Sequence, residues 1–335
     1  MSILLTGGLG YIGSHTAVAL SKAGYDIVIY DDLSNSKLSV LSSIEQLCGR
    51  KVDFVEGSTL DTAKLIRSLR DFGIVSVVHL AGLKAVGESI KSPIRYYDTN
   101  IGSAICLLKA MQSLSINHLI FSSSATVYGA PEFLPITENH PKKALNPYGR
   151  TKLQIEDMLS DLAVSDPDWR IACLRYFNPV GAHASCTIGE DPHDVPNNLM
   201  PRIARVASGL SKQLFVFGND YPTDDGTCER DYVHVEDLAE GHLAALEHLK
   251  KQKTTLEFFN LGTGQSCSVL KLISIFKEVT GKEVPSVIAP RRSGDSAICF
   301  ADVTKSKEML HWRARKSIAE MCSSAWEFHH SNIVS

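Results

Sequence analysis

The sequence predicts an α/β protein built on a doubly wound parallel (Rossmann-type) sheet, followed by a smaller C-terminal α/β domain that binds the substrate. Three observations lead to this prediction. A short apolar strand at 3–5 runs into the glycine-rich stretch TGGLGYIG, the next strand ends in an acidic residue, and strand-like and helix-like segments then alternate as far as residue 176. Such alternation is typical of parallel sheets with right-handed crossovers.

The first strand leads into a loop whose glycines have the spacing of a dinucleotide-binding turn: Gly7, Gly10 and Gly13. Glycines let backbone N–H groups approach a pyrophosphate at the N-terminus of the helix that begins at about Tyr11. Glycine spacing alone is weak evidence. However, the strand at 26–30 ends in Asp31, at the distance where such folds place an acidic residue that accepts hydrogen bonds from the adenosine ribose. Together these features predict a dinucleotide site.

The acidic pair Asp31 and Asp32, with no arginine beside it, favours NAD over NADP. Two carboxylates would repel the 2′-phosphate that distinguishes NADP. An alternative is that Asp31 simply starts a turn before Asn35, but the preceding glycine loop argues for the cofactor role.

The remaining elements of the main domain follow in order. The sequence predicts strands at 52–55, 75–80, 119–122 and 170–176, and helices at 61–72, from Pro93 onward and from Asn146 onward. Past Asn178 the chain becomes rich in Pro, Gly and Asn, which suits loops over the carboxyl ends of the strands, where open α/β sheets bind ligands. A helix at 233–249 and a strand at 258–261 are expected to return to the main sheet.

We therefore expect an NAD-binding domain at 1–178, with returning segments near 233–262, and a region at 179–335 that mainly binds substrate. The formal net charge of −3 shows no basic excess, so neither a nucleic acid nor a membrane surface is an expected partner. Eight cysteines without a C-x-x-C pair indicate reduced thiols, and no segment predicts a signal peptide or a bilayer span. These features favour the cytoplasm.

The stretch Asn146 to Lys152 predicts a reaction centre at the start of a helix. Asn146 is a good N-cap, Pro147 suits the first helical position, and Tyr148 then lies in the first turn. Lys152 is four residues further on and shares a helix face with Tyr148. The alternative for this pair in isolation is that the two are surface neighbours.

A tyrosine base needs a lowered pKa. Moving the pKa from about 10 to near 7 takes roughly 4 kcal/mol in favour of the phenolate. A helix dipole supplies about 0.3 to 1 kcal/mol, whereas an opposite charge nearby lowers a pKa by roughly 1 to 3 units. We therefore expect Lys152 to carry most of the effect and a second cation to complete it.

Several motifs identify a family. The glycine loop, Asp31, the strand end SSSATVYG at 122–129 and the Tyr148/Lys152 pair resemble the extended short-chain dehydrogenase/reductase family. More closely, AGLKAVGES (81–89), LRYFNPVGAH (174–183), PNNLMP (196–201), GNDYPTDDGT (218–227) and RDYVHVEDLAEGH (230–242) resemble the UDP-glucose 4-epimerases within it. The resemblance runs from the first strand to Asp295 and weakens after it.

This resemblance implies a reversible epimerisation of UDP-glucose and UDP-galactose at carbon 4, through a transient 4-keto sugar and with tightly bound NAD. Tyr148 would take the proton from the 4-hydroxyl and later return it, with Lys152 beside it. Ser124 would hydrogen-bond the reacting oxygen, although a serine that caps a strand end is an alternative. The positive nicotinamide would be the second cation that Tyr148 needs.

The resemblance also implies two sets of contacts. The expected cofactor contacts are Gly7, Gly10, Tyr11, Ile12, Gly13, Asp31, Asp32, Asn35, Ser36, Ser58, Leu60, Leu80, Ala81, Gly82, Lys84, Thr99, Ser122, Tyr148, Lys152 and Tyr176. The expected substrate contacts are Lys84, Ser124, Thr126, Tyr148, Phe177, Asn178, Asn198, Leu199, Phe217, Arg230, Arg292, Asp295 and Cys299. Bidentate guanidinium groups suit the two phosphates of a UDP-sugar. A homodimer through helices near 93–113 and 146–162 is also implied.

Three positions depart from the family pattern. Ser58 stands where an acidic residue commonly faces the adenine, and Thr99 replaces a frequent asparagine. Cys299 occupies a place where members carry either a bulky tyrosine or a smaller residue beside the sugar's carbon 2. A small residue leaves space, so the N-acetylated UDP-hexosamines UDP-N-acetylglucosamine and UDP-N-acetylgalactosamine become candidate substrates. The alternative is that Cys299 only packs as a small hydrophobic residue.

Other functions fit the motifs less well. A nucleotide-sugar 4,6-dehydratase needs an acidic pair after the strand-end serine, where this chain has Ala125 and Thr126. A silent NAD-binding sensor would not be expected to keep the Tyr148/Lys152 pair. The acidic and histidine residues Glu190, Asp191, His183 and His193 have no standard metal-site spacing, so no metal is predicted.

Overall fold

A seven-stranded sheet forms the centre of the protein. The computed structural model describes residues 1–192, 196–251, 255–292 and 294–334. The strands of the sheet are β1 (Ser2–Thr6), β2 (Asp26–Asp31), β3 (Asp53–Glu56), β4 (Ile74–His79), β5 (His118–Ser124), β6 (Arg170–Tyr176) and β11 (Leu256–Leu261). They lie in the order β11-β6-β5-β4-β1-β2-β3, and every neighbouring pair is parallel. The predicted α/β class with a doubly wound parallel sheet is confirmed, including the returning strand β11.

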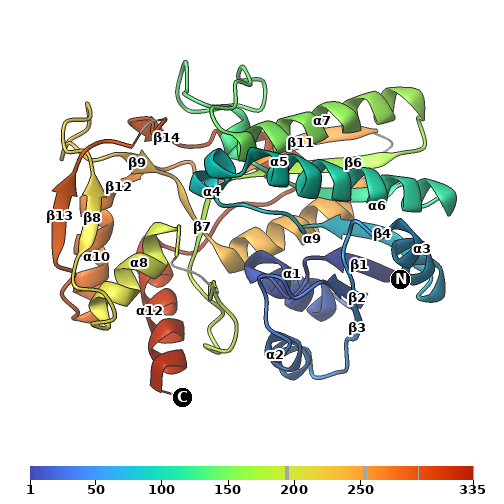
Figure 1. Ribbon diagram of the computed structural model, residues 1–335, viewed down its shortest axis with the longest axis horizontal. Coiled ribbons are helices and arrows are strands. Elements are labelled where there is room, and N and C mark those ends of the chain that lie inside the picture. The colour runs from blue at the N-terminus through green and yellow to red at the C-terminus, as the bar shows by residue number, and fades with distance from the viewer. Residues whose placement is uncertain (193–195, 252–254, 293, 335) are drawn as a thin grey trace.

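Helices cover both faces of this sheet (Figure 1). The helices on one face are α1 (Tyr11–Lys22), α2 (Ser39–Cys48) and α9 (Val235–Lys251), and those on the other are α3 (Thr62–Asp71), α6 (Gly102–Ser113) and α7 (Pro147–Ser165). Neighbouring residues of one strand face opposite sides: Leu5 packs in the cluster with α1 and α9, and Leu4 in the cluster with α3 and α6. Both faces of the central strands are therefore buried, as is typical of a parallel sheet, whereas the edge strand β3 is only partly buried.

Two predicted helices differ from the expectation in detail. The helix opened by Pro93 consists of α5 (Pro93–Tyr96), a π-helical turn η1 (Tyr97–Ile101) and α6, and Asn100 in the π turn accepts a hydrogen bond from the chain after β4. The helix expected from residue 233 begins at Val235, since 232–234 form β10 and His234 Nδ1 accepts a hydrogen bond from Glu236 N at 3.1 Å.

The C-terminal region forms a lobe at the carboxyl ends of the strands (Figure 1). Its strands are β7 (Asn178–Val180), β8 (Leu214–Phe217), β9 (Glu229–Arg230), β10 (Tyr232–His234), β12 (Cys267–Ser268), β13 (Ser286–Ala289) and β14 (Ile298–Cys299), and its helices are α8 (Leu199–Ala207), α10 (Val269–Thr280), α11 (Thr304–Met309) and α12 (Ile318–Val334). A separate core contains Met200, Leu272, Phe276 and Cys322. Two short elements, α4 (Val86–Lys91) and the 3₁₀ turn η2 (Ala125–Val127), complete the list.

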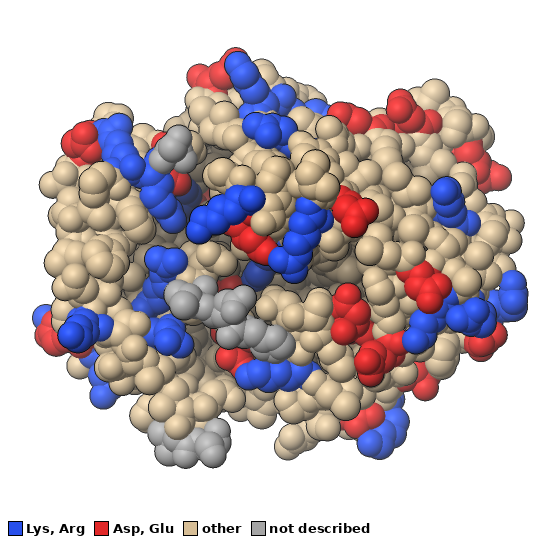
Figure 2. Space-filling model, in the orientation of Figure 1, with Lys and Arg blue, Asp and Glu red and all other residues tan. Residues whose placement is uncertain are grey.

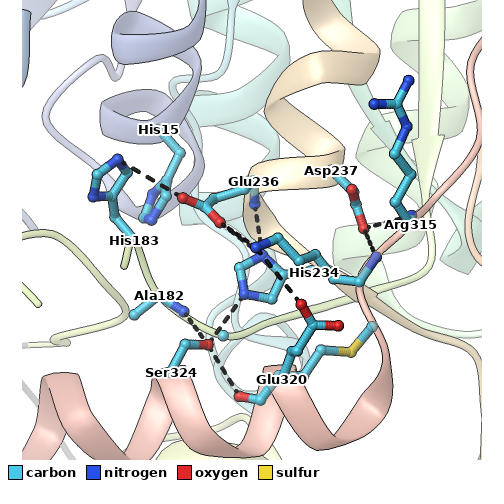
Figure 3. Close-up of polar contacts among 12 residues, drawn as sticks. His15, Ala182, His183, His234, Glu236, Asp237, Arg315, Glu320 and Ser324 are labelled. Carbon is cyan, nitrogen blue, oxygen red and sulfur yellow. Dashed lines mark hydrogen bonds and ion pairs between the residues drawn. The ribbon is translucent and has the colours of Figure 1, made fainter. Parts of the chain in front are cut away.

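A polar cluster joins the last helix to the centre of the molecule (Figure 3). Ser324 of α12 accepts a hydrogen bond from Ala182 N at 3.2 Å and forms another with His234 Nε2 at 3.1 Å. At the start of α9, Asp237 accepts the backbone N–H groups of Arg315 and Lys316. These contacts fix α12 against the chain that follows β7. Among the described residues, no helix combines the length and apolar character that crossing a bilayer requires.

Candidate functional site

The glycine loop lies between the ends of β1 and β4, where the strand order reverses. Gly7 has φ of 69°, and a Cβ there would approach Ala81 N to 2.8 Å. A Cβ on Gly13 would lie 2.2 Å from Gly7 O. Only glycine fits at both places. Gly10 caps α1 without a side-chain acceptor, so the first turn presents its N–H groups as an anion site. The loop thus fits the pyrophosphate of a dinucleotide.

Asp31 ends β2 next to this loop and is 7% exposed. Its Oδ2 accepts from Leu9 N at 3.0 Å, and its Oδ1 accepts from Ser36 Oγ at 2.7 Å and from Leu33 N at 3.0 Å. Burial raises the pKa of Asp31, while these hydrogen bonds oppose the rise. A carboxylate offers about four lone-pair sites, so capacity remains for a ribose hydroxyl. The neighbouring Asp32 and Asn35 are exposed.

Ser124, Tyr148 and Lys152 meet at the carboxyl end of β5. Asn146 caps α7, with its Oδ1 accepting from Gly149 N at 2.9 Å, and Pro147 takes the first helical position as predicted. Ser124 Oγ accepts from Thr126 Oγ1 at 2.9 Å. Lys152 is 5% exposed, and its Nζ donates to Ser122 O at 2.6 Å.

Burial shifts the pKa values of Tyr148 and Lys152. Burial raises the pKa of Tyr148, and the hydrogen bond with Ser124 only partly opposes the rise. Burial also lowers the pKa of Lys152 to about 8. Both groups are desolvated, and the Lys152 ammonium is hydrogen-bonded to a backbone carbonyl. The expected lowering of the Tyr148 pKa also requires the positive nicotinamide, so it stays a prediction.

A second group of predicted residues meets in the lobe. Arg230 lies 3.7 Å from Asp295, measured from Nη2 to Oδ1, and Arg292 Nε donates to Asp295 Oδ2 at 3.0 Å. The Arg292 guanidinium lies 4.7 Å from the centroid of the Phe217 ring. Two guanidinium groups thus share one carboxylate beside an aromatic face, which leaves a net positive charge for an anionic ligand.

Lys84 and Asn198 both contact Glu190, for which the sequence predicted no role in binding the cofactor or the substrate. Glu190 Oε1 accepts from Lys84 Nζ at 3.1 Å and from Asn198 Nδ2 at 2.6 Å. The Lys84 ammonium also lies 5.8 Å from the centroid of the Tyr11 ring. Figure 2 shows basic and acidic side chains facing each other around the hollow between the two halves.

Other predicted residues are placed less directly. The Tyr176 hydroxyl forms a hydrogen bond with His242 in the interior. Ser58 Oγ accepts a hydrogen bond from Leu60 N at 3.3 Å, and Leu60 is 42% exposed. Cys299 packs in a small apolar cluster with Val127 and Phe177, and burial raises its pKa to about 11. Their ligand contacts stay predictions.

The other residues of the two predicted sets lie on the same elements. Ile12 is in the first turn of α1; Leu80, Ala81 and Gly82 follow β4; Thr99 is in η1; Asn178 begins β7; and Leu199 begins α8. The end of β4 is held by Asn100, which sequence reasoning missed. Its Oδ1 accepts from Leu83 N at 2.8 Å, and its Nδ2 donates to Thr151 Oγ1 of α7 at 3.0 Å. An asparagine inside a predicted helix was the only signal.

A buried ion pair was also missed. Glu156 of α7 and Arg175 of β6 form two hydrogen bonds of 2.8 Å each, and their side chains are 0% and 2% exposed. Ser123 Oγ donates to the same carboxylate at 2.6 Å. The pair fixes α7, and with it Tyr148 and Lys152, against the ends of β5 and β6. An arginine in the apolar strand IACLRY was its signal in the sequence.

Within the described residues, no three His, Cys, Asp or Glu side chains gather to hold a metal ion. His183 Nε2 lies 3.7 Å from Glu236, and His193 falls outside the described residues. All eight cysteines are free.

A doubly wound sheet, a glycine loop after β1, an acidic end to β2 and a Ser–Tyr–Lys group on β5 and α7 define a nucleotide-binding enzyme of the short-chain dehydrogenase/reductase class. Within this class, the chain belongs to the NAD dependent epimerase/dehydratase family, whose model matches residues 3–262.

Several relatives that match almost the whole chain are named UDP-glucose 4-epimerase. The Bacillus subtilis enzyme is 51% identical over 99% of this chain and 98% of its own length, and the human enzyme is 46% identical over 98% and 97%. The crystal structure of the Stenotrophomonas maltophila enzyme, with bound NAD and formylated UDP-arabinopyranose, has a TM-score of 0.98 and 48% identity over 100% of this chain and 99% of that one.

Proposed function

We propose that this chain interconverts UDP-glucose and UDP-galactose by inverting carbon 4 of the sugar, with NAD as a resident cofactor. The observation that carries the proposal is the group of Ser124, Tyr148 and Lys152 at the carboxyl end of β5, in the same parallel sheet whose strand β1 leads into the glycine loop. The relatives named above support it, since they are similar over nearly the full chain.

The residues present fit NAD. The glycine loop would hold the pyrophosphate and Asp31 the adenosine ribose, with Ser36 and the chain after β4 around them. When bound, NAD supplies a reversible hydride acceptor and a positive charge. We also propose the domain division at 1–178 and 179–335, with the segment near 233–262 returning to the first domain.

Tyr148 acts as the proton carrier. Its phenolate takes the proton of the 4-hydroxyl and later returns the same proton to the other epimer. Ser124 forms a hydrogen bond with the Tyr148 hydroxyl and holds the reacting oxygen of the sugar. A 4,6-dehydratase would need carboxylates after Ser124, where Ala125 and Thr126 stand, and the Thr126 hydroxyl donates to Ser124 Oγ at 2.9 Å.

The lobe holds the nucleotide part of the substrate. Arg230 and Arg292 contribute two positive charges against the two negative charges of a sugar diphosphate, and Asp295 can turn from them to the ribose hydroxyls. Phe217 offers a flat face for the uracil. Cys299 leaves room beside the sugar, which adds the N-acetylated UDP-hexosamines as candidate substrates.

We further propose that the chain is a cytoplasmic homodimer. Exposed apolar residues lie on or beside the helices expected at the interface: Ile90 at 61%, Ile94 at 77%, Ile105 at 37% and Val164 at 88% exposed. Burying such residues against a second copy is favourable. Light scattering measures the predicted mass directly.

The test of the proposed function needs no added cofactor. The purified protein should carry NAD in its absorbance spectrum and convert UDP-galactose to UDP-glucose on its own. A requirement for added NAD, with net release of NADH, would point instead to a dehydrogenase.

A further inference from the structure

The order of the sheet places three loops side by side. Strands β4, β1 and β2 are neighbours, and all three run in the same direction. The chain after β4 carries Lys84, the glycine loop follows β1, and the chain after β2 carries Lys37. Lys84 and Lys37 therefore stand on opposite sides of the glycine loop.

Two consecutive carboxylates of the lobe reach both of these lysines. Glu190 Oε1 lies 3.1 Å from Lys84 Nζ, and Asp191 forms an ion pair with Lys37. Because neighbouring Cα atoms are only about 3.8 Å apart, these two contacts tie one short segment of the lobe, 190–191, to the chain on both sides of the glycine loop. A third contact also joins the lobe to this part of the first domain: the Tyr11 hydroxyl, at the start of α1, donates to Gly181 O at 2.7 Å.

Glu190 does more than pair with one lysine. Its side chain is 11% exposed, and the same oxygen accepts from Asn198 Nδ2 at 2.6 Å. A mostly buried carboxylate needs such partners. Glu190 therefore fixes the Lys84 ammonium, on the chain after β4, relative to the Asn198 side-chain amide at the start of α8.

We propose that Glu190 and Asp191, with Lys84 and Lys37, form a carboxylate clasp across the glycine loop that retains a dinucleotide, and that Glu190 is a positioning residue for Lys84 and Asn198 in substrate binding. This inference rests on the proposed NAD site. The outer pair is solvated, with Lys37 53% and Asp191 48% exposed, so salt weakens the clasp.

The first experiment measures the release of NAD from the loaded protein. Wild type, E190Q, D191N and the double variant are loaded with labelled NAD, chased with unlabelled NAD and passed over a desalting column at intervals. The double variant should release label about tenfold faster at low salt, and wild type should approach it in concentrated salt. E283Q is the matched control, because it removes the Lys277–Glu283 ion pair of 2.7 Å away from these loops.

A charge swap separates the clasp from a general loss of structure. The double variant K37D/D191K restores an ion pair of opposite polarity and should return release toward the wild-type rate, whereas each single change speeds it. Equal release by wild type and E190Q/D191N at low salt overturns the clasp. A wild type that binds no NAD overturns the proposed function itself.

The second experiment tests positioning. E190Q should raise KM for UDP-galactose about fivefold or more relative to D191N, because only Glu190 contacts Asn198. The thermal midpoints of the two NAD-loaded variants serve as the check on folding. Equal KM values for E190Q and D191N overturn the positioning role.

Discussion

The pocket around Tyr148 and the arginine group of the lobe handle charge in opposite ways. In the pocket, Lys152 is 5% exposed and its ammonium faces a backbone carbonyl, so burial lowers its pKa to about 8 and raises that of Tyr148. In the lobe, the Arg292 side chain is 53% exposed and paired with Asp295. In the function proposed above, proton transfer therefore falls to groups without a fixed counter-charge, and ligand binding to groups with one.

Burial alone does not separate the two regions. Glu156 and Arg175 lie directly behind the pocket and are buried as deeply as Lys152, yet each is the other's counter-ion. The hydrogen bonds with Glu156 raise the pKa of Arg175, against the effect of burial. The presence of a counter-charge thus decides which buried group can change its protonation state.

Replacing Tyr148 should abolish the chemistry of the pocket and leave ligand binding by the lobe unchanged. Tyr148→Phe removes the proton carrier without removing any arginine, so kcat should fall by about 10⁴-fold, the upper end for a general acid–base group. The affinity for UDP, measured by calorimetry, should stay within about twofold, since it depends on the lobe. A phenylalanine variant that keeps substantial turnover would exclude Tyr148 as the base.

The buried pair should dominate stability. Glu156→Gln or Arg175→Met leaves one charge buried without its partner, and we expect a loss of about 3 to 5 kcal/mol in the free energy of unfolding. The double variant Glu156→Met/Arg175→Met should recover most of it. Urea titrations of the three variants measure this, and a double variant less stable than both single ones would contradict the counter-charge argument.

Features that lie within a short stretch of sequence were easier to predict than contacts between residues far apart in the chain. The glycine loop, Asp31 and the Asn146–Pro147 helix start are local patterns, so the sheet and the place of Tyr148 could be predicted. Glu156 with Arg175 and Glu190 with Lys84 join residues far apart in the chain. The burial of Tyr148 and Lys152 was not visible in the sequence either, because desolvation depends on packing that no local pattern encodes.

The desolvated lysine predicts a pH dependence of stability. With a folded pKa of about 8 against 10.5 unfolded, the unfolded chain binds more protons between these values, so stability rises with pH there. The full penalty, about 3 kcal/mol, applies below pH 8. Protein stripped of NAD should therefore be less stable than Lys152→Met at pH 7.5, with the gap closing towards pH 10.5.

The matched control for that titration is Lys84→Met. Lys84 has 49% of its side chain exposed and a carboxylate partner, so its replacement should not reproduce the gap. Urea midpoints at pH 7.5 and pH 10 distinguish the outcomes. A gap of the same size at both pH values would mean that Lys152 acts through packing and not through its buried charge.

The smallest expected effect lies at the boundary of the two regions. Cys299 of β14 pairs in register with Arg230 of β9 and also packs with Val127 and Phe177 near the pocket. Cys299→Tyr fills space between the sugar and the arginines, so it should lower kcat/KM for UDP-N-acetylgalactosamine by about 10- to 100-fold and that for UDP-galactose far less. A substrate comparison of wild type and variant measures this. If wild type rejects the N-acetylated sugar, or if the variant keeps the same preference, Cys299 has only a packing role. Other residues then determine which substituent is accepted at the sugar's carbon 2.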